Sequence, residues 1–559
     1  VQFAYHTEKF GADGTFGRES AREILLRRYF RAALGRLNPW LTDAQMDEAQ
    51  ETLEKRLSTA SLLQVNEEKY FLIRDGIPVT VKKPSGETET KRAAVIDFHD
   101  AENNSFLAIK ELRIHGDIYR RRTDIVGFVN GIPLLFVELK KTTVDVQSAY
   151  DDNYTDYLDT IPHLFYYNAF VMLSNGTEAK VGTLGSPFAF FHEWKRLAEK
   201  DAGSVALATM LRGICRKENF LDLFENFILY DHSAGQTAKI LARNHQYLGV
   251  NEAMKAYADR TLNDGRLGVF WHTQGSGKSL SMVFYAHLLQ AALDSPTIVV
   301  LTDRNDLDDQ LYGQFVRCKE FLRQEPVHAT SRAHLRELLA GRKANGIIFT
   351  TMQKFEEADE ALSERRNIVV MADEAHRGQY GLTERIRLTH NEEGQEIAKR
   401  VVGAARVIRN SLPNATYIGF TGTPIAAKDR STREVFGDYI DIYDMTQAVE
   451  DGATRPVYYE SRVMQLKLDA ETLALIDAEY DRMAQEADAE VIEKSKRDLG
   501  QMEAVLGNDT TIDSLVQDIL EHYESFRAEL LTGKAMIVAY SRAIAMKIYE
   551  RILALRPSW

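Results

Sequence analysis

Residues 268–279 read GVFWHTQGSGKS, and this stretch decides the fold of the central part of the chain. An apolar run leads into a glycine-containing loop, after which a helical pattern begins. In such a unit the glycines let backbone N–H groups approach phosphate oxygens, the lysine reaches the β and γ phosphates, and the last serine holds Mg²⁺. The loop is therefore expected to bind ATP and Mg²⁺ through Thr273, Gly275, Ser276, Gly277, Lys278 and Ser279. The usual pattern has glycine where His272 stands here.

A second segment, residues 368–376, reads IVVMADEAH and supplies the other half of the expected nucleotide site. An apolar run ends in Asp373 and Glu374. Carboxylates at strand ends gather at the same edge of a parallel sheet as the phosphate loop. We expect Asp373 to bind Mg²⁺ through water and Glu374 to polarise the attacking water.

Strand-like runs alternate with helical segments between residues 265 and 425, which predicts a parallel sheet with crossover helices. The runs are GVFWH, TIVVL, GIIFTT, NIVVMAD and ATYIGFTG. Upstream, residues 18–60 predict two amphipathic helices that break at Asn38-Pro39, and residues 69–175 predict a mixed sheet. Residues from about 175 to 245 and residues 467–530 have a helical pattern. AMIVAYS (535–541) has the pattern of a new strand.

Residues 123–141, TDIVGFVNGIPLLFVELKK, form two β runs around a hairpin signal, Asn130-Gly131. Asp124 and Glu138 would bind Mg²⁺ with room for water and a phosphate oxygen, and Lys140 would stabilise developing charge. With a simple two-residue turn, Asp124 would oppose Val137 and the site would fail. We therefore predict a bulge or an odd-length loop that brings both carboxylates to one face. The alternative is a surface hairpin with unpaired charges.

Several segments resemble, in order, the motifs of superfamily 2 helicases and translocases. RNHQYLGV (243–250) resembles an adenine-reading motif, with Gln246 on the base edge. Residues 299–311 and 349–355 resemble the motifs that contact a nucleic-acid backbone. GFTGTP (419–424), with Thr421 and Thr423, resembles the motif that couples ATP state to DNA grip, and IVAYSR (537–542) resembles the first motif of a second lobe.

Asp124, Glu138 and Lys140 resemble the constellation of the PD-(D/E)xK nucleases. Such nucleases often carry Gln-x-x-x-Tyr on the next helix, where this chain has Asn153 and Tyr157. The role of that helix stays open, as does that of Glu19 or Glu23 as a further acidic ligand, since either is commonly helix surface.

A nuclease followed by a motor is the order found in the R subunit of type I restriction-modification enzymes, which this chain resembles. The expected fold class is α/β and multi-domain, a PD-(D/E)xK nuclease followed by RecA-like doubly wound parallel-sheet lobes. The expected ranges are a nuclease domain (1–180), a helical linker (181–245), a first RecA-like ATPase lobe (246–455) and the incomplete start of a second lobe with a helical insertion (456–559).

The resemblance implies an ATP-dependent translocase and Mg²⁺-dependent endonuclease that acts on double-stranded DNA beside methyltransferase and specificity subunits. Two alternatives stay open: a fragment of a single-chain restriction enzyme, and an ATP-dependent DNA-remodelling motor without an active nuclease. Motors of this class take an arginine from the second lobe. Arg542 lies too early to supply it, so we expect a fragment that binds nucleotide but hydrolyses ATP poorly.

Composition adds few constraints. The net charge of −13 argues against a protein that coats nucleic acid over its whole surface, yet a motor needs only a local basic groove. Basic runs at 120–122 and 140–141 are either solvated surface or DNA contacts. Two cysteines cannot form a disulfide framework, and no apolar run approaches the ~20 residues that span a bilayer, so a cytoplasmic location is expected.

Overall fold

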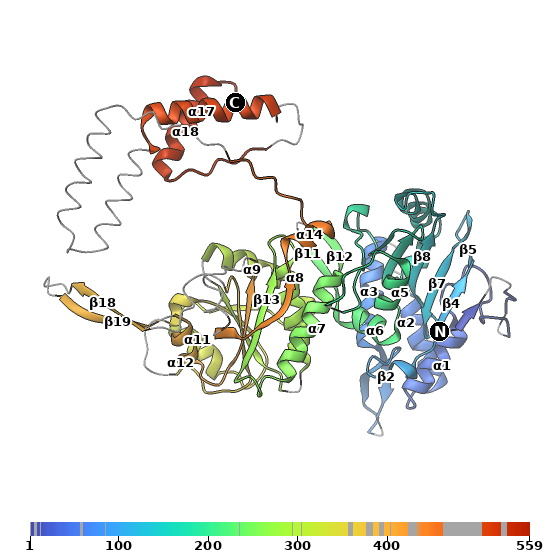
Figure 1. Ribbon diagram of the computed structural model, residues 1–559. Helices are drawn as coiled ribbons and strands as arrows, with labels where there is room; N and C mark the ends of the chain where they lie inside the picture. The colour runs from blue at the N-terminus through green and yellow to red at the C-terminus, as the bar shows by residue number, and fades with distance from the viewer. Residues whose placement is uncertain are drawn as a thin grey trace. The chain divides into compact units, whose positions relative to one another are not determined.

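The computed structural model describes the chain except for residues 1, 5–7, 12, 56–59, 84, 199, 234, 293, 303–304, 356–360, 376–383, 391–395, 403, 423–432, 434, 462–505 and 527–533. Thr423 therefore lies outside the described residues. Two compact units are present, Val1–Pro456 and Val457–Trp559. The first unit contains both sheets that concern us (Figure 1).

The N-terminal region, residues 1–180, is built on a six-stranded mixed sheet in the order β1-β4-β7-β8-β9-β10. Its strands are β1 (Gln2–Ala4), β4 (Phe106–Lys110), β7 (Ile125–Val129), β8 (Ile132–Leu139), β9 (Phe170–Ser174) and β10 (Ala179–Gly182). Neighbours from β4 to β8 are antiparallel, whereas β8 and β9 are parallel. The mixed sheet predicted for this part of the chain is confirmed.

Helices cover this sheet on both faces, since its side chains contribute to two separate apolar cores. The helices α1 (Arg27–Leu37), α2 (Asp43–Glu54) and α3 (Leu62–Asp75) contribute to the first core, and α4 (Thr155–Thr160) contributes to the second. Thr42 caps α2 by accepting from the Gln45 backbone N–H in a capping box, as the sequence predicted. The first predicted helix begins only at Arg27.

The connecting segment, residues 181–245, is helical only in part. It contains α5 (Leu207–Ile214) and α6 (Lys217–Asn226), but also an antiparallel hairpin of β11 (Ile228–Ser233) and β12 (Gln236–Leu241). The expectation of a helical linker was wrong for residues 228–241, because two short strands pair with each other there. Phe224, Leu229 and Leu241 join one apolar core with residues of the N-terminal region and of α8 (Lys278–Ala291), so this segment is firmly packed.

The lobe that the sequence predicts to be the motor, residues 246–455, has a seven-stranded sheet in which every neighbouring pair is parallel, in the order β15-β16-β14-β17-β20-β13-β21. The five predicted strand runs are β13 (Arg266–His272), β14 (Thr297–Thr302), β16 (Ile347–Thr351), β17 (Ile368–Ala372) and β20 (Thr416–Thr421). β15 (Val327–His328) and β21 (Tyr439–Tyr443) extend the sheet at its two edges.

The lobe is doubly wound, because helices cover both faces of the sheet. Side chains that alternate along each strand enter two different apolar cores. Val300, Met371 and Phe420 pack with residues of α8, whereas Val299 and Val370 pack with α11 (Arg332–Ala340) and α12 (Ala404–Ser411). Figure 1 shows α7 (Asn244–Ala258) and α8 on one side of this sheet and α11 and α12 on the other. The predicted parallel lobe is confirmed.

The second unit contains α17 (Asp509–Phe526) and α18 (Arg542–Leu555), which pack through Ile512, Val516 and Ile548. The helical prediction holds for α17. Residues 535–541, predicted to be a strand, are irregular, and the side chain of Val538 is 82% exposed. A β-branched run becomes a strand only when another strand pairs with it, and the described residues of this unit supply none.

Candidate functional site

The hairpin of β7 and β8 turns through Asn130 and Gly131, both with positive φ (49° and 81°), as a tight hairpin turn requires. Near the turn, Phe128 pairs with Pro133, but Gly127 already pairs with Leu135. Leu134 is therefore an extra residue on β8, a β-bulge. The predicted irregularity is confirmed: the bulge at Leu134 lies three residues beyond Gly131 of the turn.

The bulge determines what faces Asp124. Beyond it, Ile125 pairs with Val137, so the next position along the ladder brings Asp124 opposite Glu138. Asp124 Oδ2 accepts a hydrogen bond of 2.8 Å from the backbone N–H of Leu139, which fixes this carboxylate beside the end of β8.

Glu138 is a buried carboxylate. Glu138 is only 3% exposed, and its Oε2 has no hydrogen-bond partner among the described residues. Burial first, and then the charge of Asp124, raise the pKa of Glu138 to about 8, while Lys140 acts in the opposite direction. A cation between these two carboxylates would pair with the unsatisfied oxygen and reduce the repulsion between them, so these residues fit a hard divalent metal ion.

The helix that follows β8 contributes to the same site. A π-helix, η2 (Ala149–Tyr154), runs directly into α4, and Asn153 Oδ1 accepts a short hydrogen bond from Lys140 Nζ. Burial, and next the charge of Glu138, raise the pKa of Tyr157, whose ring packs edge-on against Phe136. Asn153 and Tyr157 thus both lie at the carboxylate pair. Single π-helical turns are frequent at functional sites.

The upstream acids lie elsewhere. Glu23 pairs with Arg27 at 3.2 Å and accepts a hydrogen bond from the backbone N–H of Glu19. Among the described residues, no group of three or more acidic, histidine or cysteine side chains could hold a metal ion, so neither Glu19 nor Glu23 joins Asp124 and Glu138 in such a group.

The phosphate loop joins β13 to α8, as predicted from the strand, loop and helix pattern. Gly275 and Gly277 have φ of 82° and 87°, a region that side chains disfavour. The loop is also tied internally, because Ser276 Oγ donates to the carbonyl of Thr273 at 2.6 Å. Ser279 lies in the first turn of α8, next to Lys278.

Asp373 and Glu374 follow β17 directly, at the same sheet edge as the loop. Lys278 Nζ lies 3.0 Å from Glu374 Oε1 and 3.5 Å from Asp373 Oδ1. Burial raises the pKa of Asp373 above its ordinary range, against the effect of Lys278. The side chains predicted to bind Mg²⁺ and phosphate are thus gathered in one place.

Gln246 lies under the loop, in a buried position. Its Nε2 donates to the carbonyl of Gly277 at 3.0 Å, and its Oε1 accepts from the backbone N–H of Arg243 at 2.9 Å. In this arrangement Gln246 holds the loop, and its reading of an adenine edge stays a prediction. His245 supports the same loop, since its Nε2 lies 2.9 Å from the carbonyl of Ser276.

Sequence reasoning missed the supports behind this loop. His272, where a glycine is usual, is fully buried, and its Nε2 lies 2.5 Å from Asp441 Oδ2 on β21. Burial lowers the pKa of His272, so we interpret this contact as a hydrogen bond donated by a neutral imidazole. Tyr443 stacks on His245 with ring centroids 3.8 Å apart. The sequence YIDIY (439–443), in which isoleucine alternates with other residues, was the signal that could have predicted β21.

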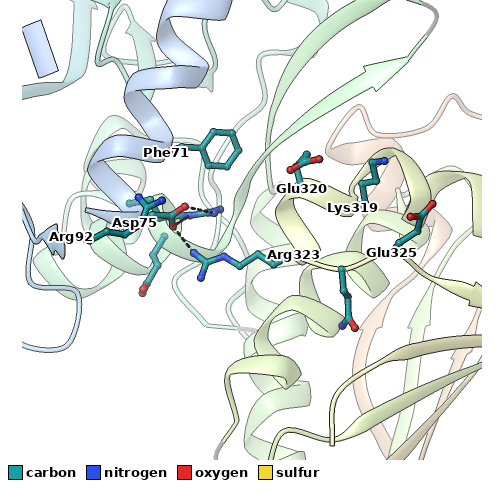
Figure 2. Close-up of a pocket in the computed structure, with 10 residues that line it drawn as sticks. Phe71, Asp75, Arg92, Lys319, Glu320, Arg323 and Glu325 are labelled. Atoms are coloured by element: carbon teal, nitrogen blue, oxygen red, sulfur yellow. Dashed lines mark hydrogen bonds and ion pairs between the residues drawn. The ribbon is translucent and has the colours of Figure 1, made fainter. Parts of the chain in front are cut away.

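A separate cleft of about 890 Å³ lies between the N-terminal region and the motor lobe, within the first unit (Figure 2). Its lining is mainly charged, and Asp75 of α3 forms an ion pair with Arg323 across it. The phosphate-loop residues and the Asp124 and Glu138 pair are not among its lining residues, so the cleft is a solvated boundary between two packed regions and not either of the candidate sites.

Known families match both halves of this arrangement. A family model described as the N terminus of the type I restriction enzyme R protein matches residues 3–190, and one described as SWI2/SNF2 ATPase matches residues 245–493. The endonuclease subunit of the type I restriction enzyme HindI from Haemophilus influenzae is 39% identical over 98% of this chain. This chain belongs to the R-subunit family of type I restriction enzymes.

The R-subunit chain spans about half the length of the curated relatives it matches: 52% of the Haemophilus protein and 51% of a Methanocaldococcus jannaschii relative that is 32% identical over 96% of this chain. A solved structure of the type ISP restriction-modification enzyme LlaBIII bound to DNA covers 40% of this chain and 17% of its own, at 15% identity and a TM-score of 0.27, too weak a likeness to support an argument. No helix in the described part of this R-subunit chain has the length and apolarity to cross a bilayer.

Proposed function

We propose that this chain cuts duplex DNA with Mg²⁺ at Asp124 and Glu138, and that the motor lobe uses ATP to move DNA toward that cut. The observation that carries the proposal is the register of β7 and β8, which brings two carboxylates together at the end of a buried strand. The family match supports the same assignment.

Mg²⁺ held by Asp124 and Glu138 would polarise a phosphoryl oxygen and supply a metal-bound water as nucleophile. Lys140 carries a positive charge that acts on Glu138. Because Asn153 holds its Nζ, Lys140 is oriented before substrate arrives and can stabilise the negative charge that develops on the phosphate. Buried, fixed donors act most strongly where water is excluded.

In the motor lobe, Lys278 and Ser279 would bind the phosphates and Mg²⁺ of ATP, and Asp373 and Glu374 would hold the metal-bound water and orient the attacking one. Lys278 forms an ion pair with Glu374, and the β and γ phosphates of bound ATP would compete for the same ammonium group. Thr421, buried at the end of β20, lies beside this edge of the sheet.

We further propose that the DNA and the methyltransferase and specificity subunits of a restriction complex are the partners of this chain. The test is separation of the two activities in that assembled complex. Glu138→Gln is expected to abolish double-strand cleavage and keep ATP hydrolysis, whereas Lys278→Ala is expected to lose both hydrolysis and translocation-dependent cleavage. Cleavage by the Glu138→Gln complex at the wild-type rate would exclude the proposed nuclease site.

A further inference from the structure

A small hairpin next to the carboxylate pair has no role in the chemistry described so far. It consists of β5 (Arg113–His115) and β6 (Arg120–Arg122), which pair in antiparallel register. Arg113 lies opposite Arg122, and His115 lies opposite Arg120. Directly opposed residues share a face, so three arginines and a histidine line one face of this hairpin.

The hairpin concentrates positive charge in an acidic chain. Residues 113–122 hold four arginines and one aspartate, a net charge of 4 − 1 = +3, whereas the whole chain carries −13. Like charges directly across a ladder destabilise it. Arg113 and Arg120, both exposed, make no ion pair with any residue that the structure describes, and Arg122 lies 3.8 Å from Glu111.

The electrostatic field on this face is positive. Burial first, and then the charges of Arg120, Arg18, Arg22 and Arg113, lower the pKa of His115. Arg113 and Arg120 have no ion pair among the described residues that would offset their charge, so a binding partner with negative charge is the physical explanation.

The tip of the hairpin is apolar and exposed. Ile118 is 84% exposed and Tyr119 is 51% exposed, while the backbone N–H of Gly116 donates to the carbonyl of Tyr119 at 2.8 Å to close the turn. The base is fixed, because the guanidinium of Arg121 pairs with Asp156 of α4 at 2.6 and 2.8 Å and lies over the Tyr119 ring. An apolar tip between cationic strands, on a fixed base, is the form of arms that enter a DNA groove.

The hairpin also has a defined position relative to the carboxylate pair. β6 ends at Arg122, and only Thr123 separates it from Asp124. The Tyr157 hydroxyl donates to the carbonyl of Arg122 at 3.2 Å, and the backbone N–H of Glu111 donates to the carbonyl of Asp124 at 2.8 Å. A phosphate backbone held on Arg122 would therefore run past Asp124.

We propose that the β5–β6 hairpin is a DNA arm, in which Arg113, Arg120 and Arg122 bind phosphates of the duplex and Ile118 and Tyr119 contact its minor groove. The inference rests on the proposed nuclease function, for which it supplies the substrate contact. Charge complementarity selects DNA over a protein partner: phosphates match three exposed arginines on one face.

The test uses the full chain and a fluorescein-labelled duplex whose binding is followed by anisotropy over a series of salt concentrations. The triple variant Arg113→Gln, Arg120→Gln and Arg122→Gln is expected to bind DNA about tenfold or more weakly at low salt, with a slope of log affinity against log salt smaller by about two to three. The matched control is Lys82→Gln, Lys83→Gln and Lys91→Gln, which removes three exposed charges from the other hairpin of this region, β2 (Ile77–Lys82) and β3 (Thr88–Ala93). The control is expected to keep the wild-type slope.

A second measurement does not depend on how well the triple variant folds. Tyr119→p-benzoylphenylalanine in the otherwise wild-type chain is expected to crosslink to the duplex on irradiation. An unchanged salt slope in a folded triple variant, or the absence of a crosslink between position 119 and the duplex, would overturn the proposal that the hairpin binds DNA. Asp124→Asn tests the nuclease site separately from the DNA-binding hairpin. If that variant still cleaves DNA in the complex, the proposed nuclease site is wrong, whatever the hairpin binds.

Discussion

Asp124 lies opposite Glu138 across the β7–β8 ladder because Leu134 adds one residue to β8. Without that bulge the partner of Asp124 would be the apolar Val137. A single inserted residue thus decides whether the hairpin presents two carboxylates together or one alone.

Removing the charge of Glu138 should stabilise the metal-free chain. A buried carboxylate beside Asp124 costs free energy of folding when no cation is bound. We expect Glu138→Gln to raise the thermal midpoint in EDTA, by the equivalent of about 1 kcal/mol or more, and to lose the stabilisation that Mg²⁺ gives the wild type. Calorimetry with and without Mg²⁺ checks this. A lower midpoint in EDTA would show that the carboxylate has a structural partner.

Asn153 should act on cleavage through Lys140. Asn153→Ala frees the ammonium group, so we expect cleavage in the assembled complex to fall about 10 to 100-fold, the usual cost of losing a side chain that orients a reacting group. Asn153→Gln keeps an amide and should retain more activity. Asp152→Ala, at an exposed neighbour on η2, is the control and should cleave normally. Equal rates for Asn153→Ala and Asp152→Ala would remove Asn153 from the site.

Lys278→Ala should abolish ATP hydrolysis without loss of fold, because this side chain is aimed at the phosphate site and not at a core. The control is Lys255→Ala, which removes an exposed lysine of α7 that pairs with Glu252 in its own helix. Steady-state phosphate release in the assembled complex, with circular dichroism of each variant, provides the measurement. Wild-type hydrolysis by Lys278→Ala is the result that this assignment cannot accommodate.

Lys239 should make stability depend on pH. This lysine of β12 is buried, donates to Asn66 Oδ1 at 2.9 Å, and burial lowers its pKa to about 7. Between about pH 7 and the ordinary lysine pKa of about 10.4, the unfolded chain holds a proton that the folded chain has released. The free energy of unfolding therefore rises with pH in this window, by up to about 1.4 kcal/mol per unit. Below about pH 7 the contribution of Lys239 to the free energy of unfolding does not change with pH.

Lys239→Met removes that titration. Chemical unfolding of the wild type and the variant at several pH values should show a smaller rise in stability for Lys239→Met above about pH 7. Parallel stability curves would mean that Lys239 keeps its proton in the fold.

The sequence was most informative where a pattern is local. Five apolar runs became strands of one parallel sheet, because a buried strand between a turn and a crossover helix needs little tertiary context. The bulge could be predicted because successive side chains of a strand point to opposite faces. With a two-residue turn Asp124 and Glu138 would lie on different faces, so a carboxylate pair required one extra residue. The position of that residue, Leu134, had no local signal.

Long-range pairing was what the sequence could not reveal. Asp441 supports His272 from the neighbouring edge strand, β21, which lies far away in the sequence, and nothing in either segment identifies the other. The strand predicted at 535–541 was wrong for the same reason, since its apolar pattern was present but the described residues around it supply no pairing strand. The β11–β12 hairpin was missed because its strands are short and lie between two helices, and the first four residues of β11 are all buried and do not alternate.

The most direct test of the metal site at Asp124 and Glu138 is Mn²⁺ binding to this chain without nucleotide, followed by electron paramagnetic resonance. We predict that the wild type and Lys278→Ala bind a Mn²⁺ ion that Glu138→Gln and Asp124→Asn do not bind. Equal Mn²⁺ binding by all four proteins would contradict the central claim that these two carboxylates form the metal site.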